Sequence, residues 1–432
     1  MVGMMKKYFY GKDIFFDQWC VLFNQIYTGG LYWIRHSKRS FYIQLGQSRS
    51  PGTFRLTFLY LKENCILKAT RPYKPTLNTH MRNLFLLSIL VISTWLGASA
   101  QDAAALIKEG IALHDKGELQ EAINKYDAAL VIEPANFKAM YEKSLSLVEL
   151  KKYDDAEELS KKILKESTDP EYRRLSYINY GTLLDYQDEG KKALKMYDRG
   201  IAEFPDSYLL YYNKGITLAG MRNVPDAIEC MQQALQRNPY HASSHNALGR
   251  LIGTDNRISA FLSLYSFLLI ESKGQRAVDN SALLNKLLMQ GVKREDGGST
   301  TININASLLD KKNKKQEDDF SSAELLLSLM AASNEIPDSL GTQTRADTLS
   351  YKVQLLIGII GDEKRTGKGF AKNFYVPFFT EMKKNNLVTI ASHIILSSSE
   401  DPTITGWLEK NKDDVEGFYR WFENYQWEWV KK

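Results

Sequence analysis

The chain has 432 residues, enough for more than one domain, and its composition of 44% hydrophobic and 25% charged residues is typical of a globular protein. The net charge of +5 comes from the first part of the chain. Residues 1–80 hold 12 Lys and Arg against three Asp and Glu, whereas residues 101–432 hold 43 against 48. The larger part is therefore mildly acidic, which argues against nucleic acid as a partner.

Residues 1–80 are basic and rich in aromatic side chains, and they contain two of the three cysteines. Their apolar residues keep neither a helical nor a strand period, so the sequence predicts no fold for them. We interpret this stretch as an N-terminal extension that is disordered or foreign to the native protein, whose chain would then begin at Met81. The alternative is a basic cytoplasmic tail before a membrane helix, which the positive-inside rule would allow.

Residues 81–100 have the three parts of a secretory signal peptide, namely a positive start, an uncharged apolar run and a small-residue site at Ala98 and Ala100. This order predicts export to the periplasm or the medium, with cleavage between Ala100 and Gln101. An uncleaved membrane helix over residues 83–101 is the alternative, although this stretch barely reaches the ~17–25 residues that span a bilayer.

A self-similar pattern follows, in which alanines are spaced by 34, 37 and 34 residues. This period is that of a helix-turn-helix repeat. Twelve residues before each alanine stands a minimal side chain, which lets two antiparallel helices approach closely, and nine residues before it stands a leucine. The alanines are Ala122, Ala156, Ala193 and Ala227; the minimal side chains are Gly110, Ser144, Gly181 and Gly215; the leucines are Leu113, Leu147, Leu184 and Leu218.

Two segments resemble complete tetratricopeptide repeats, and a fifth, degenerate repeat begins near His245. The second helix of this fifth repeat, near residues 258–272, lacks the alanine and aromatic pair of the others. The resemblance implies an all-α fold for residues 101–274, namely a right-handed α-α superhelix whose first helices line a concave groove. The two complete segments run from Tyr177-Ile-Asn-Tyr-Gly181 through Ala193-Leu-Lys-Met-Tyr197 to Phe204-Pro205, and from Tyr211-Tyr-Asn-Lys-Gly215 through Ala227-Ile-Glu-Cys-Met231 to Asn238-Pro239.

The resemblance places a binding site for a protein or peptide in this groove. Asn179 and Asn213 occupy the position from which this family often hydrogen-bonds a peptide backbone, and asparagine both donates and accepts. A clamp of two lysines and one arginine for a C-terminal carboxylate is not evident, because only Lys108 and Arg250 lie at groove positions. The groove candidates are Ile107, Lys108, Ile111, His114, Tyr141, Glu142, Leu145, Ile178, Asn179, Thr182, Asp185, Tyr212, Asn213 and Ile216.

Beyond the repeats, residues 275–320 are predicted to form a capping helix and a charged linker, with a short strand near residues 300–305. Residues 321–432 form a second, mostly helical region that resembles no family. The aromatic residues of its last predicted helix lie at helical spacing, which indicates one buried face. The predicted helices cover residues 323–333, 349–360, 375–383, 386–396 and 413–430.

No catalytic, cofactor or metal signature is found. Residues 361–369 superficially resemble a phosphate loop, but their spacing is wrong and no Ser or Thr follows the lysine. After cleavage Cys230 would be the one cysteine, which excludes an intrachain disulfide. We therefore expect an exported scaffold, not an enzyme, without cofactor or metal. Its partner would be a protein or peptide of the cell envelope, and membrane contact would occur only through residues 83–101 if they are uncleaved.

Two alternatives remain open. The first is a scaffold tethered to the membrane by residues 83–101. The second is an enzyme whose chemistry lies in residues 320–432, with the repeats delivering its substrate. A pocket there with paired carboxylates or a histidine–acid pair would favour the enzyme, whereas a packed bundle would favour the scaffold.

Overall fold

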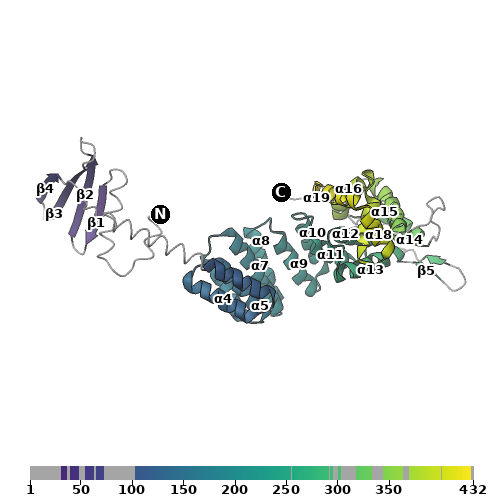
Figure 1. Ribbon diagram of the computed structural model, residues 1–432, viewed down its shortest axis with the longest axis horizontal. Coiled ribbons are helices and arrows are strands. Elements are labelled where there is room, and N and C mark those ends of the chain that lie inside the picture. The colour runs from purple at the N-terminus through teal and green to yellow at the C-terminus, as the bar shows by residue number, and fades with distance from the viewer. Residues whose placement is uncertain are drawn as a thin grey trace. The chain divides into compact units, whose positions relative to one another are not determined.

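The computed structural model comprises two compact units, residues 1–98 and residues 99–432 (Figure 1). The predicted signal peptide, residues 81–100, lies outside the residues that the structure describes. In the first unit the structure describes the backbone of four strands. In the second it describes residues 103–253, 255–290, 318–332, 344–362, 369–399 and 401–429, and the backbone of two short strands at 292–294 and 300–302.

The first unit holds a four-stranded antiparallel sheet in which each strand pairs with the next in chain order. The sequence predicted no fold for this stretch, and the strands correct that expectation. The signal was weak because the two-residue connections at 37–38 and 63–64 contain no glycine, the residue that usually marks a tight hairpin. That this stretch is foreign to the native protein stays a prediction. The strands are β1 (Leu31–His36), β2 (Arg39–Gln47), β3 (Phe54–Lys62) and β4 (Cys65–Pro72).

The second unit begins with an array of helix pairs, which confirms the predicted all-α superhelix. Each helix packs on the next, and the first helices of successive pairs also contact one another, α5 with α7, α7 with α9 and α9 with α11. The first helices therefore form one layer along the array (Figure 1). After a helix over residues 103–115 come α4 (Leu119–Ile132), α5 (Phe137–Glu149), α6 (Tyr153–Glu166), α7 (Pro170–Tyr186), α8 (Gly190–Glu203), α9 (Tyr208–Gly220), α10 (Val224–Leu235), α11 (Ala242–Ile252) and α12 (Arg257–Ile270).

The glycine of the first helix in the first, third and fourth repeats lies under a large side chain of the second helix. A Cβ atom at Gly110 would overlap the ring of Tyr126, and one at Gly181 would overlap the ring of Tyr197. Both rings are buried against the glycine backbone. This geometry confirms the reason given for the minimal side chains, since any larger residue would push the two helices apart.

The fifth pair, α11 and α12, uses the same packing in a shifted register. A Cβ atom at Gly249 would stand 2.7 Å from Leu264 and 3.3 Å from the carbonyl oxygen of Ala260, as one at Gly215 would stand 3.3 Å from that of Ala227. Ala260 and Leu264 thus replace the alanine and aromatic pair. Their role could not be predicted from the period of the other repeats, because one residue fewer separates the glycine from the alanine.

The remaining helices pack around the end of the array. Their apolar side chains share one core with α10, α11 and α12, and α12 is buried on nearly every side. Residues 99–432 therefore form one unit, in which the C-terminal region docks on the end of the repeats. These helices are α13 (Gln275–Met289), α14 (Ser321–Ala332), α15 (Arg345–Asp362), α16 (Phe370–Lys384), α17 (Val388–Ile395), α18 (Pro402–Lys410) and α19 (Lys412–Glu423), with the strands β5 (Val292–Arg294) and β6 (Thr300–Ile302) between α13 and α14.

Two details of the C-terminal region differ from expectation. The helix α18 was not predicted, and α19 ends at Glu423 rather than near residue 430. The Tyr240 hydroxyl donates to carbonyl oxygens at the end of α19, including that of Phe422 at 3.0 Å, which satisfies groups that a helix end leaves free. The chain then turns, and the Trp427 ring stacks on Phe374 and Phe378 of α16 with centroids 4.6 and 4.7 Å away.

Buried polar contacts fasten the C-terminal helices to the array. The Nε2–H group of His245 donates to the carbonyl oxygen of Pro239 at 2.8 Å, so its Nδ1 atom accepts a hydrogen bond from the hydroxyl of Tyr375, also at 2.8 Å. Arg257 of α12 pairs with Glu324 of α14 at 3.0 Å. Asn256, before α12, donates to the Asp318 backbone oxygen at 2.9 Å, and the Asp318 carboxylate accepts two backbone N–H groups at the start of α16, where a negative charge is favourable.

Among the described residues, no helix combines the length and the apolar character needed to cross a bilayer.

We expect Gly181→Ala to lower the free energy of unfolding by about 1–3 kcal/mol, because the added methyl group has to displace the buried Tyr197 ring. The matched control is Gly220→Ala on α9, where a Cβ atom meets nothing within 4 Å. This control should leave stability unchanged or slightly higher. Urea unfolding of both variants measures the difference, and equal effects would contradict the close packing at Gly181.

We also expect acid to destabilise the second unit. Burial lowers the pKa of His245 to about 4, and burial with the nearby charge of Arg276 lowers that of His241 to about 4, against 6.5 for an unperturbed histidine. Between these values the unfolded chain binds more protons than the folded one, so stability falls as the pH falls from 6.5 towards 4. For the fully buried His245 the loss is of the order of 3 kcal/mol. Unfolding midpoints across this range should depend less on pH in His245→Phe than in the wild type.

Candidate binding surface on the first helices

The groove candidates all lie on first helices, but the structure does not leave them equally accessible. Ile107 is only 3% exposed and Asn179 only 5%, so both belong to the interior. Lys108 and Ile216 are exposed, Ile216 by 40%. The others are half-buried, namely Ile111, His114, Tyr141, Glu142, Leu145, Ile178, Thr182, Asp185, Tyr212 and Asn213.

Asn179 is engaged within the fold. Its Nδ2 group donates to the Ser144 hydroxyl of the preceding repeat at 2.7 Å, and that hydroxyl donates to the Tyr141 carbonyl oxygen, also at 2.7 Å. The second repeat has Ser160 where other repeats have a large residue, and it has a hydroxyl at Ser144 in place of glycine. The asparagine donor that the resemblance assigned to a peptide is therefore used between two repeats.

Asn213 occupies the equivalent position one repeat later, with a different partner. Its Nδ2 group donates to the backbone oxygen of Leu209 at 3.0 Å, one turn earlier in the same helix. The residue that corresponds to Ser144 in the preceding repeat is Gly181, which offers no hydroxyl. A bound segment can replace such a local hydrogen bond without breaking a contact between repeats, so Asn213 is the better candidate for peptide contact.

A polar group joins the first and second repeats. His114 Nδ1 lies 2.8 Å from the Ser146 hydroxyl, and His114 Nε2 lies 3.5 Å from a carboxylate oxygen of Glu149. Burial raises the pKa of Glu142, with Lys138 and His114 opposing and Asp115 adding to the effect. Burial raises the pKa of Tyr141 to about 12, so the phenol stays protonated and can donate.

A second polar group lies on α7 and α9. The Thr182 hydroxyl donates to the Ile178 carbonyl oxygen at 2.9 Å and lies 3.2 Å from the Tyr197 hydroxyl, which reaches it past Gly181. Burial raises the pKa of Asp185, and the hydroxyl of Thr217 opposes this shift.

Apolar and aromatic side chains lie on the same helices. Tyr208 and Tyr212 of α9 contact the His241 ring at centroid distances of 4.9 and 4.8 Å. Tyr186, at the end of α7, is 62% exposed, and it was not among the predicted candidates. Its place directly after Asp185 on a first helix was the signal that could have identified it. With Ile216 it offers apolar surface to a partner.

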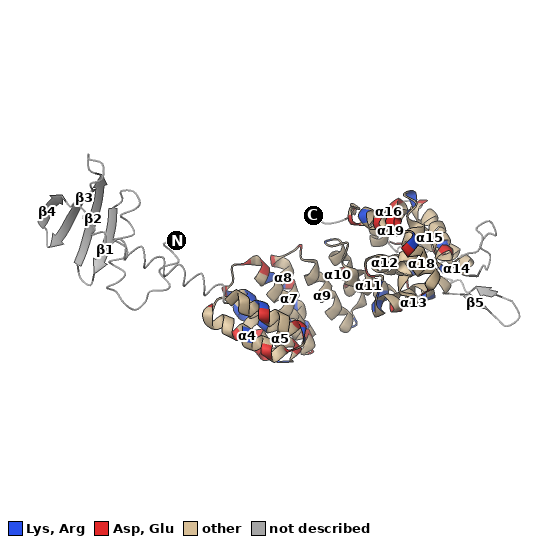
Figure 2. Ribbon diagram, viewed as in Figure 1, with Lys and Arg blue, Asp and Glu red and all other residues tan. Residues whose placement is uncertain are grey.

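The acidic residues of the outer surface are paired in a repeated way. Lys143 pairs with Asp127 at 2.6 Å between the first and second repeats, and Lys214 pairs with Asp198 at 2.7 Å at the equivalent positions between the third and fourth. Figure 2 shows acidic and basic residues mixed on α4 and its neighbours. These pairs join a first helix to the preceding second helix, so they hold repeats together and leave no strong charge of one sign.

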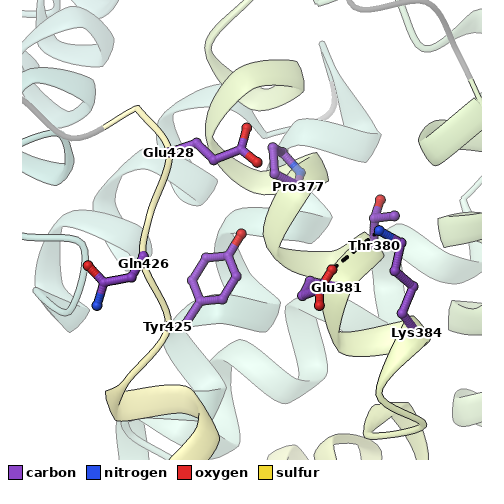
Figure 3. A pocket seen from close by; sticks show the side chains of 7 residues that line it. All are labelled: Pro377, Thr380, Glu381, Lys384, Tyr425, Gln426 and Glu428. Carbon is purple, nitrogen blue, oxygen red and sulfur yellow. Dashed lines mark hydrogen bonds and ion pairs between the residues drawn. The ribbon is translucent and has the colours of Figure 1, made fainter.

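A small polar pocket lies apart from the repeats, between α16 and the segment after α19. The Tyr425 ring extends into it, between Glu428 and Glu381 (Figure 3). Glu381 is half-exposed and pairs with Lys384 at 3.3 Å. No group of three or more potential metal ligands occurs within the described parts of the chain.

We expect Asn179→Ala to lower the free energy of unfolding by about 1–3 kcal/mol, because the change breaks a buried hydrogen bond between repeats. Asn213→Ala should cost much less, because only a bond within its own helix is lost. Thermal or urea unfolding of both variants, and of Asn179→Ala combined with Ser144→Ala, measures the coupling. Full additivity of Asn179 and Ser144 would contradict the bond.

Comparison with known proteins agrees with this architecture. Residues 113–176, 181–242 and 212–265 match family models described as tetratricopeptide repeat. The Protein STIP1 homolog of Dictyostelium discoideum is 26% identical over 154 residues, which cover 29% of this chain. The chain spans only 27% of the length of that relative.

Several solved structures are similar over the repeats. The tetratricopeptide repeat protein TTC0263 of Thermus thermophilus is 18% identical and aligns with 42% of this chain and 99% of its own, at a TM-score of 0.37. MamA of Desulfovibrio magneticus RS-1 is 21% identical and aligns with 39% of this chain and 95% of its own, at a TM-score of 0.33. The protein pilF of Pseudomonas aeruginosa is 16% identical and aligns with 45% of this chain and 91% of its own, at a TM-score of 0.37. On the matches of the family models, residues 113–265 of this chain are tetratricopeptide repeats.

Proposed function

We propose that this protein is an exported scaffold whose first helices bind a segment of another protein of the cell envelope. Tetratricopeptide repeats bind other proteins or peptides, and this general role is the starting point. The observation that carries the proposal is the layer of first helices, which contact one another from α5 to α11. A segment that lies along this layer can contact several repeats at once.

The chemistry of this layer suits a polypeptide. Ile216 and Tyr186 offer exposed apolar surface, while Asn213, Thr182 and Tyr141 offer groups that donate or accept hydrogen bonds. A peptide needs both kinds of contact, because its side chains bury apolar area and its backbone needs partners. The position of Asn213 beside Ile216 on α9 makes this part of the array the centre of the proposed contact.

The C-terminal helices complete the scaffold by covering the end of the array. Repeat arrays need a terminal unit that shields the last apolar face from water. Here α12 is enclosed by helices of the C-terminal region, and its residues are buried on nearly every side. This enclosure leaves the first helices of the earlier repeats available to a partner.

Export is the second part of the proposal and rests on residues 81–100 alone. A chain exported without disulfides depends on its packed core, which the buried apolar clusters of the second unit supply. Cys230 is buried, and burial raises the pKa of its thiol to about 11. The thiol therefore stays protonated and unreactive in an oxidising compartment.

Photo-crosslinking in the native host tests the binding surface. A photoreactive amino acid replaces Ile216 of α9 in one variant and Val131, an 82% exposed residue of the second helix α4, in the control. We expect one discrete protein adduct from position 216 and none from position 131. Adducts of equal yield from both positions, or none from position 216, would contradict binding on the first helices.

The same preparation tests export. The N-terminal sequence of the protein recovered from the cell envelope should begin at Gln101. A membrane-bound protein that still begins at Met1 or Met81 would refute cleavage and support the tethered scaffold instead.

A further inference from the structure

Two carboxylates on the first helices differ from the other carboxylates of the repeats. Glu142 on α5 and Asp185 on α7 are half-buried, and neither forms an ion pair within the described part of the chain. By contrast, Glu109 pairs with Lys125 at 2.7 Å, and Glu203 pairs with Arg173. A carboxylate that loses water without gaining a cation is costly, so these two sites differ energetically from the paired ones.

The direction of the pKa shifts follows this difference. Burial raises the pKa values of Glu142 and Asp185 above their ordinary range. For Glu203 the hydrogen bond from Arg173 holds the pKa below its ordinary range. Burial would also raise the pKa of Glu157, but hydrogen bonds from Lys161 and Tyr180 outweigh it and the pKa is lowered. The two unpaired groups are thus the ones that a further cation would stabilise.

A buried hydroxyl lies near each of these carboxylates. The Tyr126 hydroxyl is close enough to Glu142 to feel its charge, and the nearby Ser146 hydroxyl contacts His114 at 2.8 Å. The Thr217 hydroxyl is the equivalent group near Asp185. Both side chains are almost fully buried, Tyr126 at 0% and Thr217 at 1% exposure. A hydroxyl carries no charge, so it cannot replace the cation that a half-buried carboxylate lacks.

Few charged groups face the two sites. Lys138, His114 and Asp115 lie near Glu142, and Asp188 lies near Asp185. Neither Lys138 nor His114 forms an ion pair with Glu142. The His114 ring instead lies 3.5 Å from the carboxylate of Glu149. Each site therefore presents one half-buried carboxylate without an ion pair on the first helices.

We propose that the segment bound on the first helices carries Lys or Arg residues that pair with Glu142 and Asp185. The side chain of one basic residue supplies the cation that each carboxylate lacks. This inference rests on the proposed function and narrows its partner to a basic segment. A buried charge pair completed by the ligand also gives selectivity, since a neutral or acidic segment would leave the carboxylate unpaired.

Selection of short random peptides, displayed on phage, against the immobilised full-length protein tests this chemistry. We expect Lys and Arg to be enriched among the selected peptides. Binding of labelled peptides, measured by fluorescence anisotropy, should weaken about tenfold or more in Glu142→Gln combined with Asp185→Asn. The dependence of peptide binding on salt concentration should also be weaker in this double variant than in the wild type. The matched control, Glu109→Gln combined with Asp198→Asn, removes two carboxylates from paired outer sites and should change binding less than about twofold.

The outcomes separate this inference from the proposed function. Peptides without basic residues whose binding is lost in Ile216→Asp would overturn the inference and keep the function. Equal weakening by the two double variants would also overturn it. If no selected peptide depends on Ile216, both fail. Unfolding midpoints exclude a folding artefact, because the inner double variant should be at least as stable as the wild type.

Discussion

The close approach of two helices at a minimal side chain is the contact on which the repeat array depends. The α16–α17 pair shows what happens without it. Its turn has the same geometry as those of the repeats, with a left-handed residue at Asn386 and a hydrogen bond from Leu387 N–H to the Met382 carbonyl. Phe379, however, stands twelve residues before Ala391, where a repeat has a small residue. The two helices accordingly pack on α12 and α15 more than on each other.

The same contact determines what the first helices present to a partner. Where glycine admits a tyrosine ring, the hydroxyl reaches the layer of first helices, as with Tyr197 beside Thr182. At Gly215 the side chain of Met231 takes the place of the tyrosine ring, so the contact there is apolar. Asn213 and Ile216 lie on the same helix, α9. The second repeat has serine at both positions, Ser144 and Ser160, and the Ser144 hydroxyl accepts a hydrogen bond from Asn179. The small residue of the first helix and its partner on the second helix thus determine both how the two helices pack and which groups the first helices present.

The sequence was sufficient for features that depend on local spacing. Four repeats and most C-terminal helices followed from periodic apolar and small residues, which act through contacts within one helix pair. The fifth repeat was described as degenerate, because losing one residue between Gly249 and Ala260 disguises an unchanged contact. The end of α19 depends on Tyr240, about 180 residues earlier, and no local pattern reports such a partner. The burial of Asn179 likewise depends on Ser144, a residue of another repeat.

The end of the array explains why the C-terminal region belongs to the same unit as the repeats. The helix α12 is mostly apolar and buried on nearly every side, so a solenoid that stopped there would expose it to water. Covering it requires helices from later in the chain, and their polar groups must then be satisfied inside the core. His245 and Arg257 do this by bonding across the boundary to Tyr375 and Glu324, and Asn256 donates to the backbone oxygen of Asp318. Because these bonds are buried and directional, they fix how the cap sits on the last repeat, and the first helices of repeats two to four remain the free surface.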